Sequence, residues 1–201
     1  MKTPVIPEQF TGKKNDLYFE KSFSKSIDIL SVFTRACNRL LTPNTWHLLT
    51  GTTTTSFTIF DHFGNTPDRL LQAGDYIRID IPGPGSKKGD GYDWVQVKII
   101  DDHRQLSSTS AELGIQMSVC PNPFHSSPYA AHFFSSPASS SLIVSMKDAM
   151  VYTSYHGRNE TINNDTDSVA DNIRNTLVGI GAFMGLSEMQ WKALLEGLLK
   201  D

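Results

Sequence analysis

Apolar and polar residues alternate most regularly between positions 74 and 102, in GDYIRIDIPGPGSKKGDGYDWVQVKIIDD. Isoleucine occupies every second position of 77–81, and valine or isoleucine occupies every second position of 95–99. Side chains along a strand point alternately to its two faces, so each run has one apolar face and one polar, aromatic face. The glycine- and proline-containing connection at 83–91 is too long for a two-residue turn. The pattern therefore predicts two antiparallel strands joined by a long, exposed loop.

Less regular runs predict the remaining strands. Alternating or β-branched residues occur in five further segments, at 17–23, 45–60, 115–119, 142–146 and 150–156. Only residues 147–149 separate the last two segments, which predicts a second hairpin.

Three segments have apolar residues at three- and four-residue spacings, which predicts amphipathic helices. These segments are 26–41, 166–184 and 187–199. Gly185, between the second and the third, suits the C-terminus of a helix, where a left-handed backbone is common. Ser187 and Gln190 have the spacing of a capping box, which marks the start of the third helix.

The order of these elements predicts an α+β fold. We expect a strongly curved antiparallel sheet or a partly open β-barrel, with an N-terminal helix and a C-terminal helical pair packed against it. This order resembles a helix-grip (START-like) layout. The length of 201 residues fits a single domain over 1–201. Within it we expect an irregular lead-in at 1–16, a helix and antiparallel sheet at 17–160, and the C-terminal helices at 161–201.

Composition narrows the classes of function. A formal charge of −3 disfavours a nucleic-acid partner, because phosphate contacts need a basic surface. Residues 1–16 lack the apolar stretch of a signal peptide, and no run of about 18 apolar residues would span a membrane. We therefore expect a cytoplasmic protein without a nucleic-acid or membrane partner. Cys37 lies on a predicted apolar helix face, so a buried free thiol is expected, and a disulfide with Cys120 stays open.

The most unusual segment is 121–141, PNPFHSSPYAAHFFSSPASSS, which combines four prolines with a cluster of aromatic residues and histidines. Proline keeps this segment out of a central strand. A loop of about twenty residues in a compact domain is commonly functional. We expect it to fold over the sheet as a cover.

The first candidate site is the polar, aromatic face of the central strands, which carries Tyr76, Arg78 and Trp94. Aromatic rings beside a charge and hydrogen-bonding groups are typical of small-molecule sites. A solvated sheet face with the same residues stays open as an alternative, because antiparallel sheets commonly expose one face.

The second candidate site is YHGRNE at 155–160. His156 can act as an acid or base near neutral pH, and Arg158 can bind a carboxylate or phosphate with two hydrogen bonds. Tyr152 shares the face of His156. A strand end followed by a turn, with Arg158 paired to Glu160, is the structural alternative.

Motifs for common cofactors and metals are missing from the sequence. Lys87 and Lys88 are followed by Gly89 and Asp90, so the glycine-rich loop is not a P-loop. The six histidines have no metal-ligand spacing, and no nucleophile elbow of the form G-x-S-x-G occurs. The sequence therefore predicts no cofactor and no metal, and it leaves enzymatic activity open.

Four segments, IRIDIPGPGS, GDGYDWVQV, SYHGRNE and MQWKALLEGLL, resemble a family of uncharacterised bacterial proteins. The resemblance covers most of the chain. It implies that these segments belong to one domain, and it brings no activity with it.

We expect a binding protein that holds a small, partly apolar ligand on a concave sheet face. The residues predicted to bind it are Tyr76, Arg78, Trp94, Tyr152, His156 and Arg158. Two other functions stay open. One is a protein–protein interaction or homo-oligomeric module that uses the apolar C-terminal helices, with Trp191, Leu194 and Leu198. The other is an enzyme that uses His156 as an acid or base.

Overall fold

The structure is a computed structural model of the chain. It describes residues 4–22, 26–51, 55–81, 89–104, 110–125, 129–148, 150–163 and 182–200, and of residues 26–28 and 182–187 it describes the backbone alone.

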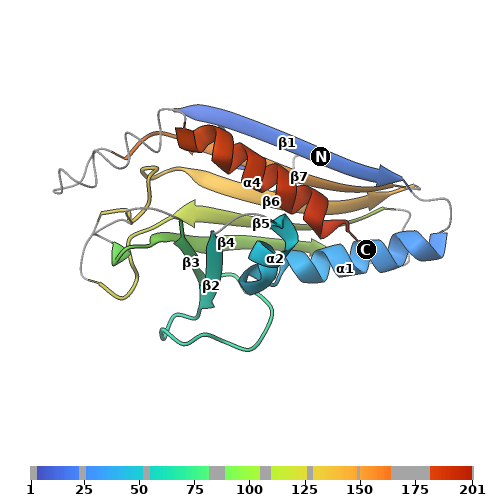
Figure 1. Cartoon of the computed structure of the whole chain (residues 1–201), viewed down its shortest axis with the longest axis horizontal. Helices are drawn as coiled ribbons and strands as arrows, with labels where there is room; N and C mark the ends of the chain where they lie inside the picture. Colours follow the sequence, from blue (N-terminus) through green and yellow to red (C-terminus); the bar gives the residue numbers. More distant parts are fainter. Residues whose placement is uncertain are drawn as a thin grey trace.

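Within the described ranges, seven strands form one antiparallel sheet, accompanied by helices on one of its faces (Figure 1). The elements in chain order are β1 Lys13–Ser22, α1 Ser26–Leu40, the 3-10 turn η1 Pro43–Thr45, α2 Trp46–Thr50, β2 Ser56–Phe60, β3 Tyr76–Asp80, β4 Asp93–His103, β5 Ser110–Val119, β6 Ser139–Lys147, β7 Met150–Glu160 and α4 Ala182–Leu198. The strand order is β1-β7-β6-β5-β4-β3-β2, so the first strand pairs with the last.

The α+β class and the antiparallel sheet are confirmed. In the predicted central hairpin, Ile77 lies opposite Val95 and Arg78 opposite Trp94, while residues 82–88 of its loop lie outside the described part. The sheet is not closed into a barrel, because β1 and β2 form its two edges. The β6–β7 hairpin and the strand at β5 also agree with the predictions.

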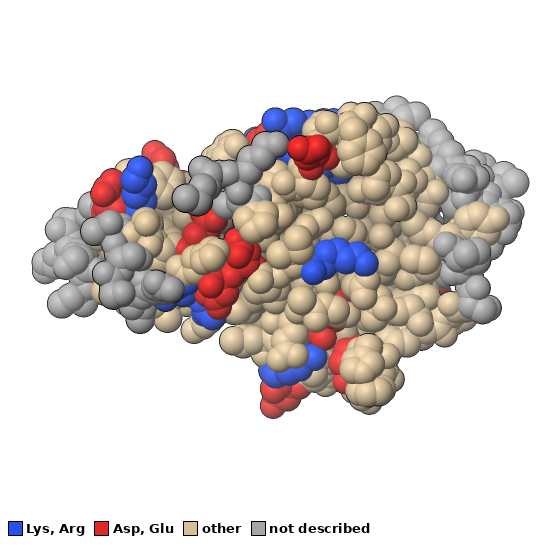
Figure 2. Space-filling model, turned by 180° about the vertical axis from the view of Figure 1, so that it is seen from behind, with Lys and Arg blue, Asp and Glu red and all other residues tan. Residues whose placement is uncertain are grey.

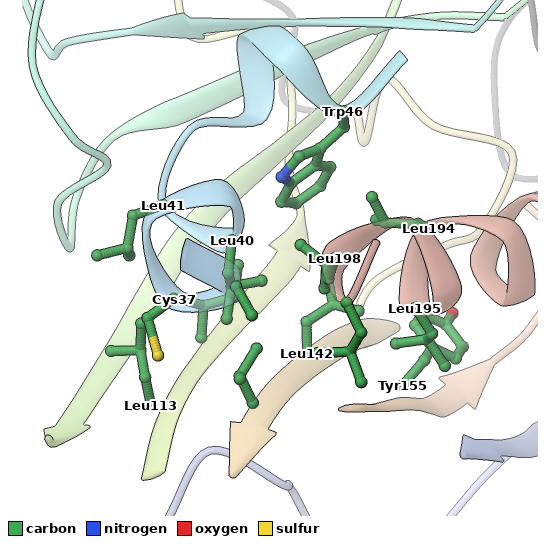
Figure 3. Packing of buried hydrophobic residues seen from close by; sticks show 14 of the residues in the cluster. Cys37, Leu40, Leu41, Trp46, Leu113, Leu142, Tyr155, Leu194, Leu195 and Leu198 are labelled. Atoms are coloured by element: carbon green, nitrogen blue, oxygen red, sulfur yellow. The ribbon is translucent and has the colours of Figure 1, made fainter. Parts of the chain in front are cut away.

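The main hydrophobic core lies between the sheet and the helices. Figure 3 shows Cys37 of α1 beside Leu113 of β5 and Leu195 of α4 beside Tyr155 of β7, while Trp46 of α2 faces Leu194 and Leu198 of α4. Phe33, Cys37, Leu40 and Leu41 of the apolar stripe predicted for residues 26–41 are buried, whereas Leu30, which was expected on the same stripe, is 38% exposed. Among the described residues, no helix has the length and apolar character needed to cross a membrane.

The N-terminal segment before β1 covers part of the other face of the sheet. Val5 lies against Gly114 of β5 so closely that a Cβ at Gly114 would overlap it. The Ser141 hydroxyl of β6 donates to the Val5 carbonyl, and the Asn159 side chain bonds the backbone of residues 8–11. This segment therefore shields side chains of β6 and β7 that would otherwise face water.

Several predicted element boundaries are wrong. β1 begins at Lys13, inside the irregular lead-in expected at 1–16. Residues 45–50 belong to η1 and α2 rather than to extended chain, because a helical turn places Trp46 fully inside the core, against Phe57 and Trp191. Gly51, with φ of 73°, ends α2. The break expected at Gly185 is absent, since α4 is continuous from Ala182. The rest of the helix predicted at 166–184 lies outside the described residues.

Candidate functional site

A pocket lies on the helix-covered face of the sheet, beside the main core. Its apolar walls come from the strands, from the two helix tryptophans and from the loop after β5: Phe57, Ile77, Ile79, Val95, Met117, Trp46, Trp191, Phe133 and Phe134. The centre of a water-sized sphere can move through a volume of about 80 Å³ inside the pocket. Since one water needs about 10–15 Å³ on this measure, the pocket has room for several waters or for a small organic group.

Aromatic stacking fixes one wall of the pocket. The Trp191 ring of α4 stacks on Tyr155 of β7, with ring centroids 4.6 Å apart and planes at 18°. Trp191 also meets the edge of Trp46, with centroids 6.5 Å apart. These contacts join α2, α4 and the sheet, so the aromatic wall is held by three separate elements.

Polar groups converge at the end of the pocket next to β7. The Tyr155 hydroxyl donates to Glu160 Oε1 at 3.2 Å, and it lies 3.2 Å from the Ser140 hydroxyl of β6. Lys13 and Asn15 of β1 line the same pocket. An apolar body with one hydrogen-bonding group would therefore find partners for both parts here.

A β-bulge turns Glu160 into the pocket. Lys13 pairs with Glu160 and Asn15 with Gly157, so β7 has one residue more than β1 between these pairs. Asn159 takes up the extra residue with φ of 57°. The alternation of faces is broken there, and Glu160 folds back over Gly157, where a Cβ would overlap its carboxylate.

The surroundings change the acidity of this polar end. Burial raises the pKa of Glu160 above its usual value, and the Tyr155 hydroxyl and the charges of Lys13 and Arg158 offset only part of the effect. Burial also raises the pKa of Tyr155 far above its usual range, so its hydroxyl stays protonated. The pocket end thus presents a neutral phenol and a carboxyl group that takes up a proton more readily than an exposed one.

The six residues predicted to bind a ligand all lie on the other face of the sheet (Figure 2), where charged side chains are interspersed with a larger uncharged surface. None of them lines the pocket. They form two groups, one on β3 and β4 and one on β7. Because β5 and β6 separate the groups, they lie about 14 Å apart at the usual strand spacing. Their joint role in binding stays a prediction.

The first group belongs to a small aromatic cluster. Trp94 is buried with Cys120 and Ala131, and its ring contacts Phe60 and Phe124. Tyr76 and Tyr92 pack around this cluster. The guanidinium of Arg78 lies over the rings of Tyr92 and Phe60, at 4.2 and 5.2 Å from their centroids. The rings therefore pack on one another, and the charge of Arg78 is balanced by cation–π contacts within the same group, as expected for a packed surface cluster.

The second group forms a buried ionic cluster with β1. Asp16 Oδ1 lies 2.7 Å from both His156 Nδ1 and Arg158 Nη1, and Lys14 Nζ lies 3.1 Å from Asp16 Oδ2. His156 and Arg158 are 5% and 6% exposed, so this cluster is no solvated surface. Tyr152, two residues before Ser154, instead donates to the sulfur of Met150. The alternative pairing of Arg158 with Glu160 does not form, since the two side chains face opposite sides.

The loop predicted at 121–141 ends earlier than expected, because β6 begins at Ser139, and its described residues contribute to both faces of the sheet. His132, Phe133 and Phe134 line the pocket, while Phe124 packs on Trp94 on the other side. Asn163 ties the loop down by donating to the carbonyls of Ala130 and His132. The loop therefore wraps around the end of the sheet rather than covering one face.

No group of three or more His, Cys, Asp or Glu side chains is placed to hold a metal within the described part of the chain. Both cysteines are buried and free, as the simpler of the two sequence interpretations predicted. Trp46, Lys13 and Ser140 also line the pocket, although no sequence pattern predicts them there. Their positions carry no local signal, because they meet only through pairing of β1, β6 and β7 and through packing of α2.

Comparison with known proteins gives distant structural likenesses. No family model and no curated protein matches the chain. A hypothetical protein from Helicobacter pylori is 9% identical, with 92% of this chain and 84% of that chain covered and a TM-score of 0.42. A major latex-like protein from Panax ginseng is 11% identical, with 94% and 100% covered and a TM-score of 0.43. A truncated norcoclaurine synthase from Thalictrum flavum is 11% identical, with 97% and 99% covered and a TM-score of 0.39. Identities and scores this low carry no information about function.

Proposed function

We propose that the chain binds a small, largely apolar molecule in the pocket between the sheet and α2 and α4. The observation that carries this proposal is the combination of an apolar, aromatic cavity with a few convergent polar groups at one end. Burial of a ligand's apolar surface supplies affinity, and the polar end fixes its orientation.

The polar end favours a ligand with a hydrogen-bond donor. Glu160 Oε1 accepts a hydrogen bond from Tyr155, and the remaining lone pairs of a carboxylate can accept others. An N–H or O–H group on the ligand would bond Glu160 while an aromatic or aliphatic body contacts Trp191 and Ile79. We therefore expect a neutral or cationic ligand with an apolar body and one amine or hydroxyl group.

Binding can be measured with N-phenylnaphthylamine, an apolar fluorophore with one N–H group. We expect its emission to rise on binding and to be excited by energy transfer from Trp46 and Trp191, which line the pocket. Ile79→Trp should fill the pocket and weaken binding at least about tenfold, equivalent to about 1.4 kcal/mol. Glu160→Leu should weaken binding of this amine more than binding of pyrene, which has no donor.

Thr58→Trp is the matched control, because Thr58 pairs with Arg78 on the other face of the sheet. It introduces the same bulky side chain on the neighbouring strand and should leave the affinity unchanged. Equal affinities of the wild type, the Ile79 variant and the Thr58 variant would rule out this pocket as the binding site.

The alternative interaction module finds less support. Leu194 and Leu198, predicted to form its apolar contact surface, are 1% and 0% exposed and pack in the core of the same chain. Trp191 stacks on Tyr155 in the pocket wall. This stripe offers no surface to a partner, and assembly through another surface stays a prediction.

A further inference from the structure

Three side chains on the face away from the helices form a continuous hydrogen-bonded relay. His156 Nδ1 lies 2.7 Å from Asp16 Oδ1, and His156 Nε2 lies 3.0 Å from Ser154 Oγ. Ser154 and His156 are two residues apart on β7, and Asp16 lies directly opposite His156 on β1. The strand register alone therefore brings a hydroxyl, an imidazole and a carboxylate into one line.

The protonation of the relay follows from the chemistry of its groups. A carboxylate can only accept hydrogen bonds, so the short contact to Asp16 places the imidazole proton on Nδ1. Nε2 of the neutral ring then accepts from the Ser154 hydroxyl. Burial lowers the pKa of His156, and the opposing effect of Asp16 does not restore it, so the neutral ring is favoured. A carboxylate that accepts from Nδ1 and a serine that donates to Nε2 are the arrangement found in Ser-His-Asp triads.

Neighbouring groups hold the relay in place while leaving its serine half-buried. Arg158 and Lys14 both bind Asp16, which keeps its carboxylate ionised and oriented. The edge of the Tyr18 ring packs against His156 with centroids 5.5 Å apart, and Tyr18 itself is 71% exposed. The imidazole is thus nearly enclosed, and the approach to the relay is from the side of Ser154 and Tyr18.

We propose that Ser154 is a nucleophile activated by His156 and Asp16, and that it accepts acyl groups from activated esters. Ser154 Oγ forms a bond to the acyl carbon as its proton passes to His156 Nε2. The ester C–O bond then breaks as His156 gives that proton to the ester oxygen, which leaves as an alcohol or phenol. Water attacks the acyl carbon and gives a proton to the neutral His156, and the bond to Ser154 Oγ breaks as this proton returns to Ser154, which releases the carboxylic acid. Asp16 acts as a positioning residue that holds the imidazole in the required tautomer.

A fluorophosphonate probe tests the nucleophile directly on the full chain. We expect phosphonylation of Ser154 with loss of fluoride, located by mass spectrometry of the peptide that contains it. The wild type should also hydrolyse para-nitrophenyl acetate faster than buffer alone. Ser154→Ala should abolish both the labelling and the protein-dependent hydrolysis, because it removes the nucleophile. His156→Gln should lower the labelling rate and the hydrolysis rate about 100-fold, the smaller end of the usual general-base contribution.

Ser145→Ala is the matched control, because Ser145 pairs with Tyr152 on the same face of the sheet but lies outside the relay. It should keep the labelling and the rate of the wild type. Labelling of a different residue, absence of labelling, or an unchanged rate in Ser154→Ala would each overturn the proposal. Circular dichroism shows whether the variants are folded, and the labelling of the wild type decides the question even if a variant does not fold.

Discussion

Asp16 is the residue on which the buried ionic cluster depends. Its carboxylate contacts His156, Arg158 and Lys14, and two of these three partners are almost fully buried. Burial by itself would raise the pKa of Asp16, but hydrogen bonds from His156, Arg158 and Lys14 outweigh it and lower the pKa from 3.8 to about 2. The folded state therefore stabilises the ionised form of Asp16 more than the unfolded state does.

The lowered pKa of Asp16 makes the free energy of unfolding depend on pH in a direction that can be stated. Because the folded pKa of Asp16 is depressed, its contribution is present above pH 3.8 and is lost as the pH falls toward about 2. Asp16→Asn should lower the free energy of unfolding at neutral pH by roughly 1–2 kcal/mol, a figure discounted for the partial exposure of the carboxylate. Urea denaturation at several pH values measures this, and the difference from the wild type should shrink across that acidic window.

Asp102→Asn serves as the surface comparison, since Asp102 is 40% exposed and bonded to Arg104. Removing that ion pair should change stability by less than about 1 kcal/mol. An equal loss in the free energy of unfolding for both variants at neutral pH would show that the Asp16 cluster contributes no more than an exposed ion pair does.

At the scale of elements, the contact between α2 and α4 shapes the pocket wall. Gly197 of α4 lies against Leu49 of α2, and a Cβ at this position would overlap the Leu49 carbonyl oxygen. Arg39 of α1 adds to this corner by donating to the carbonyls of Gly197 and Leu198 at the end of α4. The close approach brings Trp46 and Trp191 together at the pocket.

Gly197→Ala tests this close approach. In an isolated helix the change would stabilise by about 1 kcal/mol, because glycine is a poor helix former. Here we expect destabilisation of about 1–3 kcal/mol, since α2 and α4 would have to move apart. Thermal or chemical denaturation gives the sign, with Glu196→Ala, at an exposed position of the same helix, as control. A more stable Gly197→Ala protein would show that the two helices are not in tight contact.

At the scale of the whole molecule, the two cysteines report on opposite faces of the sheet. Cys37 lies in the main core and Cys120 in the aromatic cluster around Trp94. Burial raises the pKa of each thiol to about 12, so neither forms a reactive thiolate in the folded chain near neutral pH. Their reaction with a thiol reagent therefore reports unfolding of the face on which each lies.

If the chain is a single domain, as we expect, both thiols should become reactive at the same denaturant concentration. An aromatic disulfide reagent added to Cys37→Ala and Cys120→Ala, each with one remaining thiol, measures the two transitions separately after correction for the stability of each variant. Reaction of Cys120 well before Cys37 would show that the outer cluster unfolds independently of the core.

The sequence by itself determined the features that depend on local periodicity. Most of the apolar stripe of α1, the alternation in β3 and in the first part of β4, and the β6–β7 hairpin follow from spacings of two or of three and four residues. The alternation predicted for 95–99 fails at Ile99, because a bulge after Val97 pairs Ile99 with Gln116 and turns Ile100 toward the core instead. The sequence also singled out His156 and Arg158 as an unusual polar cluster. Short-range backbone geometry decides such patterns, so no knowledge of distant residues was needed.

Only the tertiary structure decided which face of the sheet each residue occupies and which residues meet. Alternation shows that Ile77 and Arg78 face opposite sides, but packing of the helices against Ile77 determines which side becomes the pocket. The Asp16–His156 contact joins residues 140 positions apart through pairing of the first and last strands. Such contacts arise from the pairing register and the bulge at Asn159, which are set by the energy of the whole sheet and leave no periodic trace in the sequence.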